Sequence, residues 1–237
     1  TSGTAAISAV TLANAAIFYL GNTTNGSTSP FNRHMARVSL TSTTQVTGNK
    51  GSATSSAVAS FVVVEFASGV LQSSTQQITV ANNSPLTTGT TALTSVTAGN
   101  TLLAYGGYET TSPNNNMSKI PYLELTTGIL VTSTRVDSTN DVTSGVTAIE
   151  FKTADVKLIQ RGTSVIAATA TTQDSTITSV DTSNAFVNYL GNTASGNNTV
   201  GDEIFARQEL NSATVSRATR NTADASNTTT TSYEVFE

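Results

Sequence analysis

The chain has 237 residues, a formal net charge of −4, 11% charged residues and 37% hydrophobic residues. A negative net charge argues against a nucleic-acid-binding protein, because such proteins need a basic face to neutralise phosphates. The sequence contains no cysteine, which excludes disulfides, thiol chemistry and cysteine-ligated zinc. It has no run of about 18 apolar residues, so no membrane-spanning helix and no membrane insertion are predicted.

Thr, Ser and Asn supply much of the remaining sequence. Thr favours strands because its branched Cβ packs well on a pleated surface, and Ser and Asn favour turns because their side chains bond nearby backbone. This composition indicates a β-protein with polar, uncharged loops. The alternative, a disordered Ser/Thr-rich linker, fits less well because disorder usually accompanies low hydrophobicity and high net charge.

In chain order, the first 66 residues read as short strands separated by polar loops. Residues 1–6 are small and polar, and we expect a loose lead-in. Short alternating or continuously apolar runs bounded by Gly, Asn and Ser predict strands. The expected strands are residues 7–10, 15–20, 31–40, 45–47 and 58–66.

The following part of the chain predicts an additional strand at the start of each later copy. Residues 70–72 and 78–80 precede the second copy, and residues 158–160 and 165–166 precede the third. The first copy has no visible counterpart. We infer that its opening strand is missing, remodelled or supplied by another chain, because an unpaired sheet edge is a liability unless it is covered.

The chain contains one pattern three times, which is the strongest signal in the sequence. An asparagine anchors each copy, with intervals of 86 and 84 residues (100 − 14 and 184 − 100). An aliphatic residue lies seven positions before each asparagine and a valine four before, while a tyrosine follows five after and a glycine seven after. The residues that define the repeat are Asn14, Tyr19, Gly21, Asn100, Tyr105, Gly107, Asn184, Tyr189 and Gly191.

This triplication predicts an all-β fold of three tandem, small antiparallel β-sandwich (Ig-like) repeats of about 80 residues each. The predicted domains are residues 1–67, whose opening strand is missing, 68–153 and 154–237. We expect three separate hydrophobic interiors. The joints, residues 67–69 and 152–156, are too short to be free linkers, so adjacent repeats should touch.

The repeated residues have a structural interpretation and a functional one. Each asparagine suits a turn, where Asn tolerates unusual backbone angles, and each glycine suits a position with positive φ. Each tyrosine either packs at a strand end with its hydroxyl bonded to backbone, which we favour, or is exposed for contact with a carbohydrate or protein.

Long polar insertions follow the tyrosine and glycine in every copy, at residues 21–30, 106–117 and 191–201. They should therefore emerge at the same end of the molecule, and loops on a rigid scaffold commonly carry recognition. The candidate interaction residues in these insertions are Asn22, Asn25, Tyr108, Asn114, Asn192 and Asn197.

Possible catalytic or metal-binding residues are few, and a surface or turn role is favoured for each. His34 is the only histidine, and nothing near it suggests a partner base. Neither Asp137 with Asp141 nor Asp202 with Glu203 matches the spacing of a calcium loop. We therefore predict no enzyme activity, no cofactor and no metal site.

Three glutamates recur near the end of each copy, and the sequence alone aligns Glu65, Glu150 and Glu234. A single glutamate without a carboxylate partner is a poor hydrolase. We expect each to face solvent or to pair with a basic residue such as Arg37 or Arg207.

The third copy carries the clearest version of the repeated segments. It has Leu-Ile-Gln-Arg-Gly-Thr at 158–163, Ala-Arg-Gln-Glu-Leu at 206–210 and Ser-Tyr-Glu-Val-Phe at 232–236. The first copy keeps Ala-Arg-Val-Ser-Leu at 36–40, whereas the second has Tyr122 and Leu123 in place of Ala-Arg. This order resembles the short β-repeat modules of structural proteins of tailed bacteriophages, often called tail-fibre-like. Such motifs specify a fold and a virion context, and they transfer no catalytic residue.

The resemblance implies a non-enzymatic protein of the virion surface, either a capsid decoration protein or a head fibre. The implied partners are other virion proteins of the capsid or tail lattice, with a homo-oligomer or symmetric array of copies. The alternative is a tail-fibre segment or an adhesin whose loops bind a host surface glycan. The aromatic content of 6% and the absence of tryptophan give that alternative little support.

Overall fold

The computed structural model describes residues 1–24, 35–53, 55–67, 69–112, 117–196 and 201–237. Within these ranges the chain is an all-β protein built of antiparallel strands packed as sandwiches, as the sequence predicts. Its single α-helix in the described residues, α1 (Gly201–Ile204), is one turn long. None of the helices described is long and apolar enough to cross a membrane.

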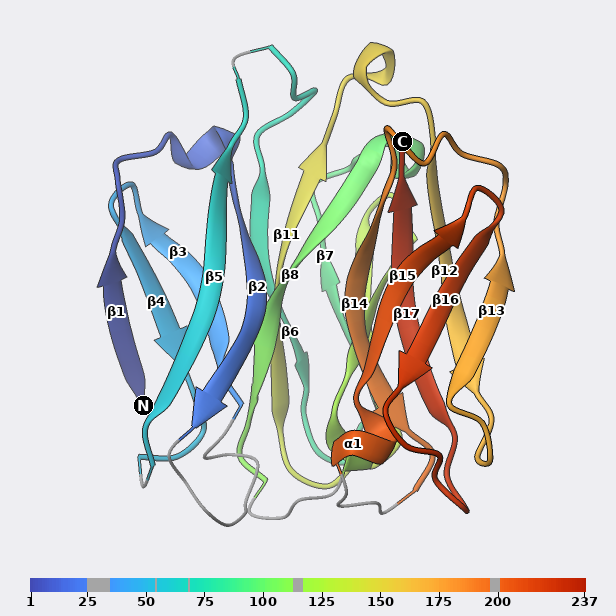
Figure 1. Ribbon diagram of the computed structural model, residues 1–237. Coiled ribbons are helices and arrows are strands. Elements are labelled where there is room, and N and C mark those ends of the chain that lie inside the picture. Colours follow the sequence, from blue (N-terminus) through green and yellow to red (C-terminus); the bar gives the residue numbers. More distant parts are fainter. Residues whose placement is uncertain (25–34, 54, 68, 113–116, 197–200) are drawn as a thin grey trace.

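Seventeen strands make up the described fold (Figure 1). The part up to residue 67, here the first segment, contains β1 (Ser2–Ala6), β2 (Ala15–Thr24), β3 (Arg37–Ser42), β4 (Gln45–Asn49) and β5 (Ala57–Glu65). The second segment, residues 68–153, contains β6 (Gln76–Asn82), β7 (Thr88–Ala92), β8 (Thr101–Thr110), β9 (Tyr122–Thr127), β10 (Leu130–Thr134) and β11 (Val142–Glu150). The third segment, residues 154–237, contains β12 (Ile159–Ile166), β13 (Thr172–Thr176), β14 (Phe186–Ala194), β15 (Ala206–Ser212), β16 (Val215–Arg220) and β17 (Thr229–Phe236).

The same strand pairings occur in each segment. One set of three strands is β1-β4-β3, then β7-β10-β9, then β13-β16-β15. The other set is β8-β11-β6 in the second segment and β14-β17-β12 in the third, but only β2-β5 in the first. The first segment thus has a counterpart of β7 and none of β6 in the described residues. Independent folding of the three predicted domains stays a prediction.

The sheets do not stop at the segment boundaries. The register places Arg37 of β3 opposite Gly107 of β8, which joins β1-β4-β3 to β8-β11-β6 as one six-stranded sheet. In the same way Tyr122 of β9 lies opposite Gly191 of β14. Tyr122 therefore takes the place of Arg37. Each segment passes its hairpin sheet on to the segment that follows.

The turn before each anchor asparagine differs from the expectation. Residues 7–10 form no strand, and residues 2–6, expected to be a loose lead-in, form β1 on the edge of β4. The aliphatic pair instead hangs from the β3–β4 turn and its counterparts. Ile7 and Val10 donate their N–H groups to Thr44 and Thr43, and Leu93 bonds Ile129 in the same manner. These side chains turn toward the hydrophobic core from a loop, which alternation alone does not reveal.

Three short 3-10 turns lie next to strands at corresponding places in the three segments of the described chain or at their joints: η1 (Leu12–Asn14), η3 (Ala98–Asn100) and η5 (Thr153–Asp155). A fourth, η4 (Met117–Lys119), precedes β9.

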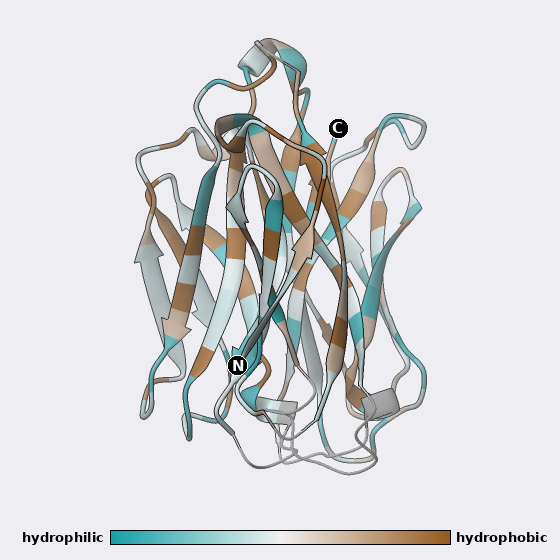
Figure 2. Cartoon of the chain, turned by 90° about the vertical axis from the view of Figure 1, so that its left-hand side faces the viewer, coloured by the Kyte–Doolittle hydropathy of each residue, from teal (hydrophilic) through white to brown (hydrophobic). Residues whose placement is uncertain are grey.

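The expectation of three separate interiors is wrong at the boundaries. One cluster joins Ala16 of the first segment, Leu102 and Ile149 of the second, and Ile159 of the third. The largest cluster, centred on the second segment, also takes in Leu190, Ala194 and Ile204 from the third. Bands of apolar and polar residues alternate along the strands (Figure 2), but alternation does not tell which segment supplies the opposite wall.

Candidate functional site

The repeated tyrosines form a ladder across the segment boundaries. The rings of Tyr19 and Tyr105 meet edge to face with centroids 6.2 Å apart, and those of Tyr105 and Tyr189 do so at 6.4 Å. Edge-to-face aromatic pairs add to the stabilisation that burial provides. Burial raises the pKa of all three hydroxyls. Phe66, Phe151 and Phe236 make a second ladder, with centroid distances of 5.4 and 5.1 Å.

The tyrosine hydroxyls bond side chains and not backbone. Tyr19 donates to Oδ1 of Asn22, and Tyr189 donates to Oδ1 of Asn192. Tyr108 stands at the matching position of the second segment, and its hydroxyl is buried without a hydrogen-bond partner in the described structure. Tyr108 and Asn192 are both buried, so neither is available to a partner, and Asn22 is half-buried. Asn25, Asn114 and Asn197 lie outside the described residues.

The repeated glycines have the positive φ that the sequence predicts, at 119° for Gly21, 77° for Gly107 and 101° for Gly191. The latter two also sit where adjacent sheets meet. A Cβ on Gly107 would lie 2.5 Å from the Ala36 carbonyl oxygen, and one on Gly191 would lie 2.6 Å from that of Pro121. These glycines permit the close backbone approach at both boundaries.

The anchor asparagines end a single turn, in which their N–H groups bond Thr11, Thr97 and Asp181 at 2.9, 2.9 and 3.0 Å. None of them has positive φ, because Asn140 alone among the described non-glycine residues does. The expected turn is present, but the expected unusual backbone angle is not.

The recurring glutamates fasten these turns. Glu65 accepts the N–H of Thr11 at 2.8 Å, and Glu150 accepts that of Thr97 at 2.7 Å. In the third segment, however, Glu237 accepts the matching N–H of Asp181 at 3.0 Å. The alignment of Glu234 with Glu65 and Glu150 is therefore wrong. The hydrogen bond from Thr11 holds the pKa of Glu65 below its usual value, and Lys157 does the same for Glu237.

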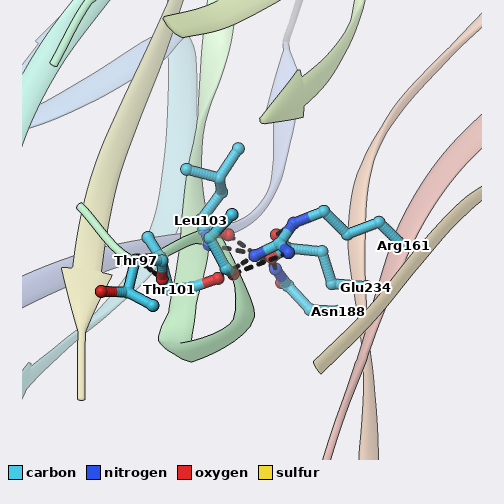
Figure 3. Close-up of polar contacts among 7 residues, drawn as sticks. Thr97, Thr101, Leu103, Arg161, Asn188 and Glu234 are labelled. Atoms are coloured by element: carbon cyan, nitrogen blue, oxygen red, sulfur yellow. Dashed lines mark hydrogen bonds and ion pairs between the residues drawn. The ribbon is translucent and has the colours of Figure 1, made fainter. Parts of the chain in front are cut away.

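Glu234 instead belongs to a buried polar cluster at the boundary between the second and third segments (Figure 3). One carboxylate oxygen accepts Nε of Arg161 at 2.8 Å. The other accepts the backbone N–H of Leu103 at 2.8 Å and the amide of Asn188 at 3.1 Å. The expected partners, Arg37 and Arg207, bond Glu109 and Glu209.

The cluster satisfies the backbone of β8 where no strand does. Asn188 donates to the Leu103 carbonyl at 2.6 Å, and Arg161 donates to the carbonyls of Ala98, at 2.8 Å, and Thr101. β8 pairs with β11 along its length but meets β3 at a single residue pair. Side chains of the third segment therefore bond the backbone of the second where an added strand would otherwise lie.

Burial raises the pKa of Glu234, and Arg161, the Leu103 N–H and Asn188 oppose this shift. A buried carboxylate with a cation and two further donors is well satisfied, and breaking such a pair leaves a costly unpaired charge. The geometry identifies a boundary lock, because every donor and acceptor is directed at a protein group.

The first boundary has a neutral version of this lock. Gln77 of β6 accepts the N–H of Leu40 at 2.7 Å and donates to its carbonyl at 3.0 Å. Arg37 adds an ion pair with Glu109, at 2.7 Å between Nη2 and Oε1.

Two buried arginines were missed from the sequence. Arg135 donates to the carbonyls of Asn82 and Leu86, and Arg220 donates to those of Ala167 and Ala170. Each thereby fixes the loop after the opening strand of its segment. Their interval of 85 residues, which also leads back to Lys50 (220 − 135 and 135 − 50), was a readable signal.

The carboxylates considered for a cation do not converge. Asp137 bonds the N–H and hydroxyl of Thr139, at 2.7 and 2.6 Å, whereas Asp141 accepts the N–H of Ser84 at 2.9 Å. No group of three or more potential metal ligands occurs among the residues described. The backbone of Glu203 accepts Arg220. The side chain of Asp202, and all of His34, lie outside what the structure describes.

Comparison with protein-family models, with curated proteins and with solved structures found no match to this chain. A function for this chain therefore has to be inferred from its own fold and contacts.

Proposed function

We propose that the chain is a non-enzymatic structural protein of a tailed-phage particle, located on the virion surface as a capsid decoration or head-fibre protein. The observation that carries this proposal is that residues recurring in three copies hold one segment to the next. Tyr19, Tyr105 and Tyr189 stack in one ladder, and Gly107 and Gly191 join sheets. The recurring pattern thus supports assembly as the role.

A face of the first segment supports docking on other proteins. Leu20 is 65% exposed, whereas its counterpart in the third segment, Leu190, is 1% exposed. Val62 is 42% exposed, whereas Thr147 at the same place in β11 is 1% exposed. In the later segments these positions are covered by the preceding segment, so this face of the first segment fits packing against another protein.

The binding mechanism in this proposal is adhesion between folded surfaces. Thr, Ser and Asn faces with few charges can pack on a lattice or on sister subunits without burying unpaired charges. A symmetric array of copies then strengthens many modest contacts through avidity. The partners would be other virion proteins and further copies of this chain.

Labelled antibody against the chain, imaged on intact particles of the phage that carries the gene, tests the proposal. We expect label over the capsid surface. A purified monomer that neither labels nor binds such particles would contradict it. Binding to a glycan array that is lost when the loops are replaced would favour an adhesin instead.

A further inference from the structure

The strand β5 has one edge without a partner strand. In the second segment β11 lies between β8 and β6, and in the third β17 lies between β14 and β12. β5 is the matching strand, since Glu65 takes the place of Glu150. Within the described chain β5 pairs with β2 alone. An open edge of this kind is a template for adding a strand.

The inward side chains of β5 show what is missing. In β11 the inward positions Val142, Ser144, Val146 and Ala148 are all buried. The matching residues of β5 are Ala57, Ala59, Phe61 and Val63, and all four are only half-buried. The difference coincides with the presence of β6 beside β11.

A groove of about 450 Å³ lies beside these residues. Ala59 and Phe61 of β5 form one wall and β1 the other, and Val38 and Val46 lie between them. Its lining is mainly apolar side chains and strand backbone, which suits an extended chain.

A pair of glycines marks the path of the missing strand. Gly89 of β7 lies against β6 so closely that a Cβ there would collide with the Ala81 carbonyl. Gly3 occupies the same place in β1, opposite Gly48 of β4 as Gly89 lies opposite Ser133 of β10. Around Gly3 no atom lies within 4 Å of a Cβ. β1 therefore leaves the space that β6 fills beside β7.

A cation also stands at the matching place. Arg135 and Arg220 follow their hairpins, and their N–H groups bond Thr87 and Thr171. Lys50 bonds Thr1 in the same way and lines the groove. The two arginines hold the carbonyls that follow β6 and β12, so Lys50 is placed to meet the end of an added strand.

We propose that this groove accepts an extended strand of seven or eight residues from a partner polypeptide, which adds antiparallel to β5 as β6 adds to β11. Every strand of the described chain is already paired within its own sheets, so the occupant comes from a different polypeptide. The inference rests on the geometry of β5 and does not require the virion role.

The two internal strands define the chemistry of the occupant. Their inward positions carry glutamine first and then small, aliphatic or amide side chains: Gln76, Ile78, Val80 and Asn82 in β6, and Gln160, Gly162, Ser164 and Ile166 in β12. Gln76 accepts the N–H of Thr94 at 2.7 Å and donates to its carbonyl at 3.1 Å. Gln160 bonds Thr178 in the same two ways. A glutamine at the start of the partner strand would meet Ser8, the matching residue of the first segment.

Synthetic peptides with the sequences of residues 75–82 and 159–166 test the proposal by fluorescence anisotropy on the full chain. We expect saturable binding of one peptide per chain, a melting temperature that rises with peptide concentration, and slower amide exchange confined to residues 57–65. The control is the first peptide with lysine at the positions of Ile78 and Val80, which should not bind. Slower exchange elsewhere with none at residues 57–65 would overturn the proposal.

The variant Gly3→Leu fills the groove from β1, where nothing lies close. We expect its melting temperature to stay unchanged and its peptide affinity to fall at least tenfold. Gly99→Leu is the matched control, because Gly99 also has open space around it but does not line the groove. Equal binding to both variants would refute the assignment. Concentration-dependent dimers that Gly3→Leu abolishes would assign the groove to a second copy and so overturn the partner strand.

Discussion

The Nε atom of Arg161 lies 2.8 Å from Oε1 of Glu234, and the pair bonds the backbone of a strand from another segment. The Glu234 side chain is fully buried. The stability of the chain should therefore depend on this contact far more than on ion pairs at its surface.

Replacing Glu234 by alanine should lower the free energy of unfolding by about 3–5 kcal/mol, because Arg161 is left without its counter-ion and the Leu103 N–H loses its acceptor. Glu234→Gln keeps an acceptor and should cost less. Denaturant unfolding measures both. The control is Glu209→Ala, which removes an exposed pair with Arg207 and should cost less than about 1 kcal/mol. Equal costs for Glu234→Ala and Glu209→Ala would show that the buried pair is no lock.

Tyr105→Ala should lower the free energy of unfolding by about 3–5 kcal/mol, since it removes a buried ring that contacts both Tyr19 and Tyr189. Tyr189→Ala should lower the melting temperature by a few degrees and less than Tyr105→Ala, because Tyr189 ends the ladder. Calorimetry compares them with Ile129→Ala, an exposed turn residue that should change little. If Tyr189→Ala left melting unchanged but abolished binding to particles, this tyrosine would be a contact residue.

Gly89→Ala and Gly3→Ala test whether β1 leaves open the space that β7 does not. At Gly89 the new methyl collides with backbone of β6, which should cost about 1–3 kcal/mol. At Gly3 it meets nothing, and the change should stay within about 0.5 kcal/mol. Chemical denaturation of the two single variants measures the difference. Similar losses at both positions would contradict the open groove.

Alkaline pH should unfold the protein. Burial raises the pKa of Tyr105, Tyr108 and Tyr189 above the ordinary value of about 10. The folded state then binds more protons than the unfolded state above that pH, so the stability is fully present below about pH 10 and is lost as the pH rises toward the folded-state values. Tyrosinate absorbance and circular dichroism, followed together, should change in one step. Ionisation of these tyrosines near their ordinary pKa with the fold intact would contradict their burial.

The candidate residues were only partly readable from the sequence. The interval pattern found the tyrosines and the glycines, and it correctly gave the glycines positive φ. It misplaced Glu234, because alignment by neighbouring phenylalanines cannot detect a shift of strand register. The hydrogen bond from Asp181 places Glu237 at that position instead.

By itself the sequence determined the fold class, most strands and the absence of an opening strand in the first segment, because alternation and spacing are local properties. Only the tertiary structure decided that β3 continues into β8 and β9 into β14, and that the hydrophobic clusters cross the boundaries. The physical reason is that a strand exposes two edges and two faces, and its sequence records how apolar a face is, not which distant strand covers it.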